Sequence, residues 1–573
     1  MPKKWELREK KNIKFDEIIL QKYDPIVLAL LSDRGVFSQK EIEDFFSSDY
    51  ANLSNVENVS GMREAVARIV LAKEQKERIV IFGDYDADGV TATVLMFEAL
   101  SELGLSNLTY YIPDRQLEGY GMNEKAIEFL AKDGVTLIIT VDSGITNIFE
   151  VEKARSLGID VIITDHHHIP EALPSAVAVI NPHLENSGFA FTDLAGVGVA
   201  FKLAQGLYQE MMPEKNDQLK WFLDLVAIGT VADCVPLLSE NRILVKYGLV
   251  VLSKTRRVGL QEMFKVGRIE ISENSIPNTH KIAFQIAPRI NAAGRMDHAS
   301  VSYRLIAEKN SVEARLMALD VEAKNLERQK MTTEIIKEIE ETALRDFSDK
   351  KFIYVANPNW PVGILGLVAG KAVDKFGKPV VVFQAQDDEY VGSLRSIPEL
   401  NIIEKIEECA SLLSKFGGHS QAAGVRVIPE NFEKFCTKMT ELIEAELENK
   451  ETISRLLIDL EIRASEINWE FMEELKKMEP FGMGNKEPVF MMKDMQISDV
   501  RAVGNGSKHL KLTLKATDNS PKLFEAIAFK LGEKFSDLKK GDNIDIVFNL
   551  QEDSWNGNKK IQLNIIDLKN GRA

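Results

Sequence analysis

Cysteine is scarce in this chain, and long apolar runs are missing from it. The 573 residues include three cysteines, Cys234, Cys409 and Cys436, an odd number without paired spacing. This pattern excludes a disulfide framework and argues against a thiolate zinc site. No apolar run approaches the roughly 18 residues that a membrane span needs, and the first residues lack the apolar stretch of a signal peptide. We therefore expect a cytoplasmic protein that does not associate with membranes.

An excess of positive charge is also missing. The chain has 71 lysines and arginines against 87 aspartates and glutamates, a formal net charge of −16, which argues against a protein that coats nucleic acid by bulk electrostatics. Residues 501–573 differ, because they hold 13 basic and 9 acidic residues, and 13 − 9 gives a local charge of +4. This tail is a candidate polyanion-binding module.

What the chain does have is the composition of a soluble globular protein, with 45% hydrophobic and 28% charged residues, and a length that predicts about three to four domains. Short apolar runs recur in its first half, at residues 78–82, 136–141, 160–164 and 177–180. Apolar strands separated by helix-length segments are typical of a parallel sheet covered on both faces. We predict a doubly wound α/β domain over 56–265, after an N-terminal segment 1–55.

The second half predicts three further parts. Residues 301–357 contain neither glycine nor proline and are rich in charge, which predicts one or two long solvated helices within a connector over 266–349. Strand-like runs near 351 and 379 predict a second, smaller α/β domain over 350–450. Alternating strands after residue 455 predict a small β-barrel over 455–573.

Acidic and histidine residues follow the ends of successive predicted strands. They are Asp84, Asp86 and Asp88 after the first run, Asp142 after the second, and Asp165, His166, His167 and His168 after the third. The carboxyl ends of parallel strands lie along one edge of a sheet, so these side chains should converge. Clustered carboxylates repel one another unless a divalent cation binds, and carboxylates with one or two imidazoles favour Mn²⁺ or Mg²⁺. Asp233, at the end of another apolar run, could complete the site.

Other interpretations of these acids are weaker. An EF-hand needs a glutamate where this chain has Leu95, so that interpretation fails. A haloacid-dehalogenase-like phosphatase would use Asp86 as a nucleophile, which leaves the histidines without a role. Helix capping explains an isolated aspartate after a strand, but not the whole set.

Two glycine-rich segments suit phosphate binding. Residues 416–424 offer backbone N–H groups and an imidazole at an expected helix N-terminus, and residues 392–396 offer two hydroxyls and a guanidinium in an expected turn. Arg289 and Arg295 lie on a further glycine-containing segment, and Arg115 is a weaker candidate. Ordinary tight turns and interdomain salt bridges remain the alternatives.

Taken together, these segments resemble the DHH phosphoesterase family. The matching motifs lie at residues 83–89, 141–144, 164–167, 231–233 and 417–424, and a junction at 480–485 precedes the β-rich tail. The resemblance covers nearly the whole chain. It implies that 350–450 is a DHH-associated C-terminal domain and that 455–573 is an OB-fold which binds nucleic acid.

The resemblance also implies roles for individual residues. The metal ligands would be Asp86, Asp88, Asp142, His166 and Asp233, with Asp142 bridging two Mn²⁺ or Mg²⁺ ions. Asp84, Asp142 and His167 would be catalytic, His167 touching the scissile phosphate or a metal. The chemistry of the phosphate-binding segments above adds the expected substrate-binding residues Arg115, Arg289, Arg295, Ser393, Arg395, Ser396, Gly417, Gly418 and His419. Many family members have histidine where this chain has Phe82, so the first metal is expected to be held more weakly.

The implied activity is hydrolysis of single-stranded DNA from the 5′ end by a two-metal-activated water, releasing mononucleotides, in DNA repair and recombination. Phe529, Lys508 and Lys511 of the tail would hold the downstream strand by stacking and charge. Besides single-stranded DNA, a single-strand-binding protein and a helicase are expected partners of a monomer. Two alternatives stay open, a DHH enzyme for short oligonucleotides or small phosphate compounds and a catalytically silent replisome scaffold.

Overall fold

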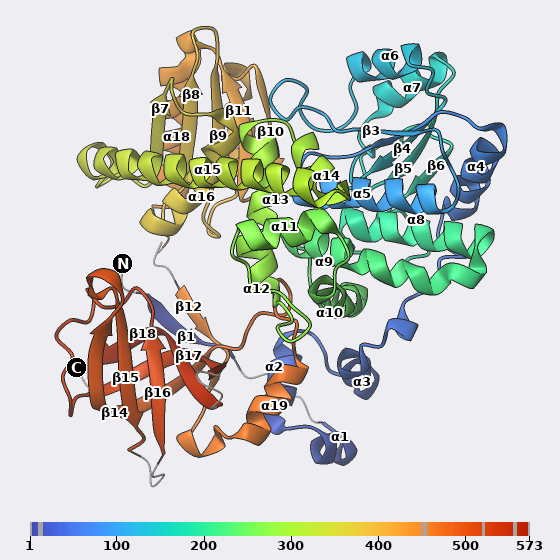
Figure 1. Cartoon of the computed structure of the whole chain (residues 1–573). Helices are drawn as coiled ribbons and strands as arrows, with labels where there is room; N and C mark the ends of the chain where they lie inside the picture. Colours follow the sequence, from blue (N-terminus) through green and yellow to red (C-terminus); the bar gives the residue numbers. More distant parts are fainter. Residues whose placement is uncertain are drawn as a thin grey trace. The chain divides into compact units, whose positions relative to one another are not determined.

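The computed structural model describes residues 3–9, 15–448, 450, 455–517, 522–553 and 559–570. The chain forms two compact units, both drawn in Figure 1. The α/β unit comprises Leu53–Val235 and Ile243–Ile453, and the barrel unit comprises Met1–Asn52, Pro236–Arg242 and Ser454–Ala573.

The first sheet of the α/β unit is entirely parallel, with the strand order β3-β2-β4-β5-β6. Its strands are β2 (Ile79–Phe82), β3 (Leu108–Tyr111), β4 (Leu137–Val141), β5 (Asp160–Thr164) and β6 (Ala178–Ile180). Every residue of β2 and β4 is buried, because helices cover both faces. The doubly wound parallel sheet is therefore confirmed, and its winding direction reverses between β2 and β4.

The two layers of helices are distinct in Figure 1. Val80, Ile138 and Ile163 pack against α6 (Glu124–Lys132) and α7 (Ile148–Ser156). The opposite face carries α5 (Ala87–Glu102) and α8 (Gly196–Met211), and α4 (Met62–Gln75) contacts β6. Further helices follow along the chain: α9 (Leu223–Ala232), α10 (Ser239–Ser253), α11 (Val258–Val266), α12 (Thr279–Lys281) and α13 (Ala287–Met296).

The charged stretch without glycine or proline is helical, as predicted. It forms α14 (Ser300–Ala307) and the 36-residue α15 (Ser311–Asp346). Asn310 caps α15 by accepting hydrogen bonds from the N–H groups of Val312 and Glu313, which satisfies two of the unpaired donors of the first turn.

The second sheet has the order β10-β11-β9-β8-β7. Its strands are β7 (Ile353–Asn357), β8 (Val380–Ala385), β9 (Tyr390–Arg395), β10 (Lys415–His419) and β11 (Ala422–Val427), and its helices are α16 (Val362–Phe376), α17 (Ile402–Glu407) and α18 (Pro429–Glu446). The pair β7–β8 is parallel and the other pairs are antiparallel.

Two local predictions about this sheet are wrong. Residues 416–424 form the β10–β11 hairpin rather than a helix N-terminus, because Ala423, Val425 and Val427 alternate into the core and impose a period of two. Residues 392–396 do not form a turn, since most of them belong to β9. Gly392 faces the ring of Phe383, where a Cβ would lie 2.3 Å from a ring carbon.

The barrel unit confirms the predicted β-barrel. The order β14-β15-β16-β18-β17 closes through a β14–β17 pairing, and β13 extends the sheet. Its elements are β13 (Leu460–Glu461), β14 (Phe490–Val503), β15 (His509–Lys515), β16 (Leu523–Ala528), β17 (Asn543–Asp553) and β18 (Lys560–Asn570), with α1 (Glu17–Lys22), α2 (Pro25–Asp33), α3 (Gln39–Ser47) and α19 (Trp469–Lys477). The N-terminal β1 (Lys4–Leu7) pairs with β12 (Arg455–Ile458).

The short segment Pro236–Arg242 belongs to this unit because of Arg242. Its side chain is fully buried and donates hydrogen bonds to the carbonyl oxygens of Phe45 (3.0 Å) and Met478 (2.8 Å). The guanidinium also lies 3.9 Å from the centre of the Phe45 ring. Burial lowers the pKa of Arg242 to about 9.

Across the described ranges, no helix is both long enough and apolar enough to cross a membrane.

The core under the first sheet should respond strongly to truncation. Ile138 of β4 is fully buried, so Ile138→Ala is expected to lower the free energy of unfolding by about 2–5 kcal/mol. Leu117→Ala is the matched control, because Leu117 is 87% exposed and its loss should cost less than about 0.5 kcal/mol. Urea denaturation of both variants checks the expectation, and equal effects would contradict it.

Candidate metal centre

The predicted acids and histidines meet at the carboxyl edge of the first sheet. Asp84 and Asp86 follow β2, Asp142 follows β4, and His166 and His167 follow β5. These three loops lie beside the reversal of winding between β2 and β4, which is where ligands bind in open α/β sheets. The predicted convergence is therefore present in the structure.

Three overlapping groups of side chains could each hold a metal ion. In each group the ligand atoms lie within 4.8 Å of one another. The groups are Asp84, Asp86 and Asp142; Asp88, His166 and Asp233; and Asp142, His166 and His167. His166 Nε2 lies 3.1 Å from Asp142 Oδ1 and 3.7 Å from Asp233 Oδ2. The five predicted ligands thus share one site, and Asp84 and His167 lie beside them.

Backbone N–H groups fix the first motif. Asp86 caps α5 by accepting from the N–H groups of Asp88 and Gly89. The Asp88 carboxylate accepts from the N–H groups of Gly196 (2.7 Å) and Val197 (3.0 Å) at the N-terminus of α8. Helix N-termini favour such negative charge, so the fold itself holds these carboxylates in place.

Glycine is required at two helix positions that pack against the ligands. A Cβ at Gly196 would lie 2.3 Å from the Asp142 carboxylate, and one at Gly229 of α9 would lie 2.5 Å from the Asp88 carboxylate. Any larger residue would displace a ligand. Asp233 ends α9 as its C-cap, so the apolar run before it is a helix.

Asp142 has an unusual backbone, with φ +60, which costs energy for a residue other than glycine. Its carbonyl oxygen accepts a hydrogen bond from the Tyr120 hydroxyl (3.1 Å), which also lies 2.9 Å from His167 Nδ1. Tyr120 therefore ties the loop after β4 to the loop after β5.

Asp165 orients the histidines. Its carboxylate is completely buried and accepts from the N–H groups of Ile145 and His166, and it lies 2.7 Å from His167 Nδ1. Burial opposes its charge, but the hydrogen bonds with His167 and Ile145 prevail and lower the pKa of Asp165. His167 consequently keeps Nε2 available.

Four carboxylates of the site resist ionisation, those of Asp84, Asp88, Asp142 and Asp233. Burial and the neighbouring Asp86 raise the pKa of Asp84 to about 8 and that of Asp233 to about 7. Burial also raises the pKa values of Asp88 and Asp142 well above the ordinary range, and nearby carboxylates add to this effect.

The donor atoms fit divalent cations. Burial and the adjacent His167 lower the pKa of His166 to about 4, so its imidazole is neutral and offers a lone pair. In the described part of the chain, Asp84 Oδ1, Asp142 Oδ1 and His166 Nε2 are buried and make no hydrogen bond, although the last two atoms lie 3.1 Å apart. Oxygen-rich sites with an imidazole suit Mn²⁺ and Mg²⁺, and a bound cation would keep the carboxylates ionised.

Phe82 occupies the position where a histidine was expected from the resemblance. It is fully buried in β2, and its ring stacks on Tyr111 of β3 with centroids 5.0 Å apart. The side chain therefore belongs to the core and does not contribute a ligand.

Several arginines gather near the acids. Arg395 Nη1 donates to Ser393 Oγ (3.2 Å) within β9, and Arg295 Nη1 donates to the carbonyl of Gly363 in α16 (3.0 Å). Burial, together with repulsion from Arg115, Arg328 and Arg395, lowers the pKa of Arg295 to about 9. Arg115 lies over the Tyr85 ring at 4.5 Å. The cluster therefore combines residues from the domain of the first sheet, such as Arg115, with residues from the domain of the second sheet, such as Arg395.

Other predicted substrate-binding residues have partners within the protein. Arg289 donates to both oxygens of Glu322 (2.5 and 3.0 Å), and Ser396 Oγ donates to the Leu400 carbonyl (2.9 Å). Gly417, Gly418 and His419 lie on exposed β10. The His419 ring is 6.3 Å from that of His168, so β10 reaches the loop that carries the histidines.

Three site residues had no role in the sequence analysis. Tyr120 lies between Gly119 and Gly121, both with positive φ. This pair of glycines was the sequence feature that could have indicated a special loop around Tyr120. Asn291, whose Oδ1 accepts from the N–H of Ala87 (2.8 Å), lies within the segment that supplied Arg289 and Arg295. Arg328 of α15 gave no signal, because it is one of many charges on that helix.

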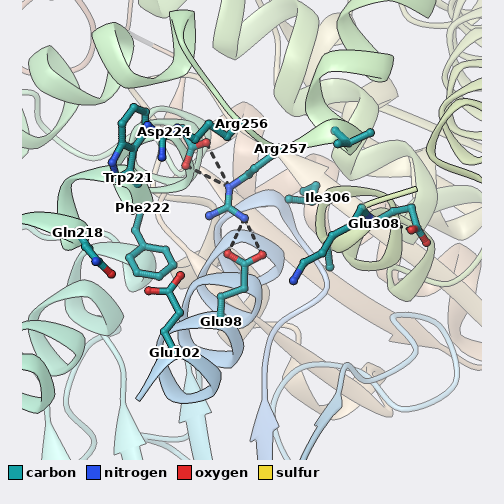
Figure 2. Close-up of a pocket in the computed structure, with 13 residues that line it drawn as sticks. Glu98, Glu102, Gln218, Trp221, Phe222, Asp224, Arg256, Arg257, Ile306 and Glu308 are labelled. Carbon is teal, nitrogen blue, oxygen red and sulfur yellow. Dashed lines mark hydrogen bonds and ion pairs between the residues drawn. The ribbon is translucent and has the colours of Figure 1, made fainter. Parts of the chain in front are cut away.

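A pocket of about 470 Å³ lies at the other end of α5, shown in Figure 2. In its wall Arg257 bridges Glu98 (2.6 Å) and Asp224 (3.2 Å), while Arg256 stacks on Trp221 at 3.6 Å. The charges of Arg257, Glu98 and Asp224 in the wall therefore pair with one another.

Family models match most of the chain. The DHH family N-terminal domain matches residues 78–230, the DHHA1 domain residues 349–445, and the RecJ OB domain residues 458–567. The single-stranded-DNA-specific exonuclease RecJ of Bacillus subtilis is 37% identical over 98% of this chain and 70% of its own length. RecJ of Escherichia coli is 33% identical over 95% of both chains.

Solved structures agree with this similarity. RecJ of Thermus thermophilus in complex with Mn²⁺ superposes with a TM-score of 0.82 at 27% identity, covering 100% of this chain and 80% of that one. Its complex with Mg²⁺ gives a TM-score of 0.76 at 26% identity, covering 79% of that chain. The ligand geometry, the domain matches and these relatives together show that the chain belongs to the RecJ family of DHH proteins, whose curated members are named single-stranded-DNA-specific exonucleases.

Proposed function

We propose that this protein is a divalent-metal-dependent exonuclease that degrades single-stranded DNA from its 5′ end. The observation that carries the proposal is the set of three overlapping ligand groups around Asp142 and His166, in a chain of the RecJ family. The intact ligand set disfavours a silent scaffold. The OB domain distinguishes the chain from an enzyme for small phosphate compounds.

In this proposal Asp86, Asp88, Asp142, His166 and Asp233 hold two Mn²⁺ or Mg²⁺ ions. When bound, the ions lower the pKa of the attacking water and stabilise negative charge on the phosphodiester. The chain's own residues fix the geometry: the N–H groups of α8 hold Asp88, and Asp165 orients His167. His167 then contacts the scissile phosphate, and Asp84 is a further catalytic residue next to the metal ligands.

The arginine cluster would set the direction of digestion. Arg295, Arg395 and Ser393 are candidates to bind a terminal 5′ phosphate, because guanidinium groups pair with phosphate oxygens. Since Arg289 is already paired with Glu322, it would act by positioning α13 rather than by touching substrate. With the 5′ phosphate anchored there, cleavage at the metal centre would release mononucleotides.

The barrel unit would hold the downstream strand. Phe529 is 55% exposed, and its ring lies edge-on to His509 at 5.4 Å, which provides a surface for base stacking. Lys508 adds positive charge beside it, whereas Lys511 shares Glu525 with Lys560. The expected single-strand-binding protein and helicase partners, the monomeric state and the cytoplasmic location stay predictions.

A digestion time course tests the proposed activity. A 3′-labelled, 5′-phosphorylated single strand should shorten stepwise with Mn²⁺ or Mg²⁺, while its duplex persists. Chelation by EDTA should stop the reaction, and Asp142→Ala should slow it by about 10³-fold or more. A single strand that survives with every metal, while dinucleotides are cleaved, would contradict the proposal.

The raised carboxylate pKa values predict how pH affects the metal-free protein. The folded pKa of Asp84 (about 8) exceeds its ordinary value of 3.8, so the folded state prefers the protonated form. Stability should therefore fall as pH rises from about 5 to 8. Thermal unfolding in EDTA should show a shallower fall for Asp84→Asn, and Mn²⁺ should stabilise the wild type more at pH 8 than at pH 6. Parallel pH curves for the two proteins would contradict this.

Arg395→Gln tests the phosphate subsite. Losing one charge-assisted contact should raise the KM for a 5′-phosphorylated strand by about tenfold or more, while leaving a 5′-hydroxyl strand nearly unaffected. Arg345→Gln is the control, because Arg345 is exposed and pairs with Asp346. Equal losses on both strands would indicate a purely structural role.

A further inference from the structure

The long helix α15 is apolar on two sides. Figure 1 shows it running along the α/β unit, past α13 and α16. Its inner side packs against the unit at intervals of three, four and once seven residues, through Ala314, Ala318, Val321, Asn325, Thr332, Ile335, Ile339 and Ala343. This spacing is the ordinary pattern of a helix that covers a core.

A second set of apolar residues lies on the outer side of the same helix. Val312, Leu316, Leu319 and Leu326 are 64%, 57%, 49% and 55% exposed, and Ala323 is exposed between them. The intervals are four, three, four and three residues, which places all five within about 40° of one line. We call these five residues the outer stripe of α15.

The outer stripe is continuous, and it is bounded. Single exposed leucines are common on protein surfaces, but five apolar residues in heptad register form a seam about 21 Å long, of the kind that pairs with another helix. The next two positions of the same line are Lys330 and Thr333. The seam therefore ends after two heptads, although the helix continues.

The charges that border the outer stripe are uneven. On one border, Arg315 pairs with Glu262 and Glu322 with Arg289, so these charges are used within the protein. The other border carries Glu313, Asp320 and Glu327, all exposed.

On that second border, Asp320 pairs with Lys324 (2.7 Å). In the portion of the chain that the structure describes, the carboxylates of Glu313 and Glu327 have no cationic partner. They leave negative charge beside an exposed apolar seam.

We propose that the outer stripe of α15 docks an amphipathic helix of a partner protein whose apolar face is bordered by lysine or arginine. Such a helix would bury the leucines and pair its cations with Glu313 and Glu327, in the way that flanking charges select partners in coiled coils. None of the five residues of the outer stripe belongs to the metal centre, so this proposal goes beyond the exonuclease activity.

A second copy of this chain is a poor occupant. An antiparallel pair of α15 helices would set Glu313 of one copy opposite Glu327 of the other. A parallel pair would set Glu327 opposite Glu322; it would also set Arg315 opposite Asp320, but each of these two residues already has an ion-pair partner within its own chain. Like charges across a helix interface disfavour the pairing, and the net charge of −16 per chain adds repulsion.

The test uses a defined probe and the full chain. The probe is a labelled peptide of about three heptads, with leucine at both core positions and lysine at the flanking positions, and a matched peptide has glutamate in place of lysine. Fluorescence anisotropy should show binding of the lysine peptide to the wild type. Leu316→Gln with Leu319→Gln should weaken it at least tenfold without changing the charge, whereas Leu344→Gln, an exposed leucine outside the outer stripe, should not.

Charge reversal completes the test. Glu313→Lys with Glu327→Lys should shift the preference toward the glutamate peptide. Binding that is insensitive to the leucine substitutions, or that does not change preference with the charges, would overturn the proposal. Sedimentation velocity should show a monomer; a dimer that dissociates in the Leu316→Gln, Leu319→Gln protein would show that a second copy covers the outer stripe, and would also overturn it.

Discussion

The repulsion among buried carboxylates at one sheet edge is the constraint on which the site depends. Asp84, Asp88 and Asp142 are at most 4% exposed, so water cannot screen their charges. The surrounding structure counters the repulsion with the N-terminus of α8, and with glycines at 196 and 229 that let helices approach the ligands. The negative charge of these carboxylates is still not compensated within the described part of the protein, and a bound divalent cation would compensate it.

Positive charge is concentrated beside this acidic site, although the chain as a whole is acidic. Four arginines lie close enough to repel one another: Arg115, Arg295, Arg328 and Arg395. A bound anion would reduce this repulsion. In the proposed function, a phosphodiester strand would answer both charges, because its terminal phosphate would pair with the arginines and its scissile phosphate would lie at the cations. In that proposal, residues of both α/β domains would contribute to one binding surface within their unit.

The sequence predicted the parts of the fold that depend on local pattern. The short apolar runs at 78–82, 136–141 and 160–164 form β2, β4 and β5, and the parallel geometry makes their trailing acids converge. The strand β3 went unpredicted because Leu108–Tyr111 is only half-buried at the sheet edge. The β10–β11 hairpin was mistaken for a helix N-terminus because glycine pairs suit both. Contacts such as Arg289 with Glu322 and Tyr120 with Asp142 join distant residues, so no local pattern could reveal them. The ligand roles of the site residues remain predictions.

The most direct test counts the protons released when Mn²⁺ binds the metal-free protein at pH 6.5. Isothermal titration calorimetry in buffers of different ionisation enthalpy gives that number. With pKa values of about 8 for Asp84 and about 7 for Asp233, the cluster should hold protons that the cations displace, so release of about one to two protons is expected. Binding without proton release would contradict the account, because the carboxylates would then be ionised before any cation arrived.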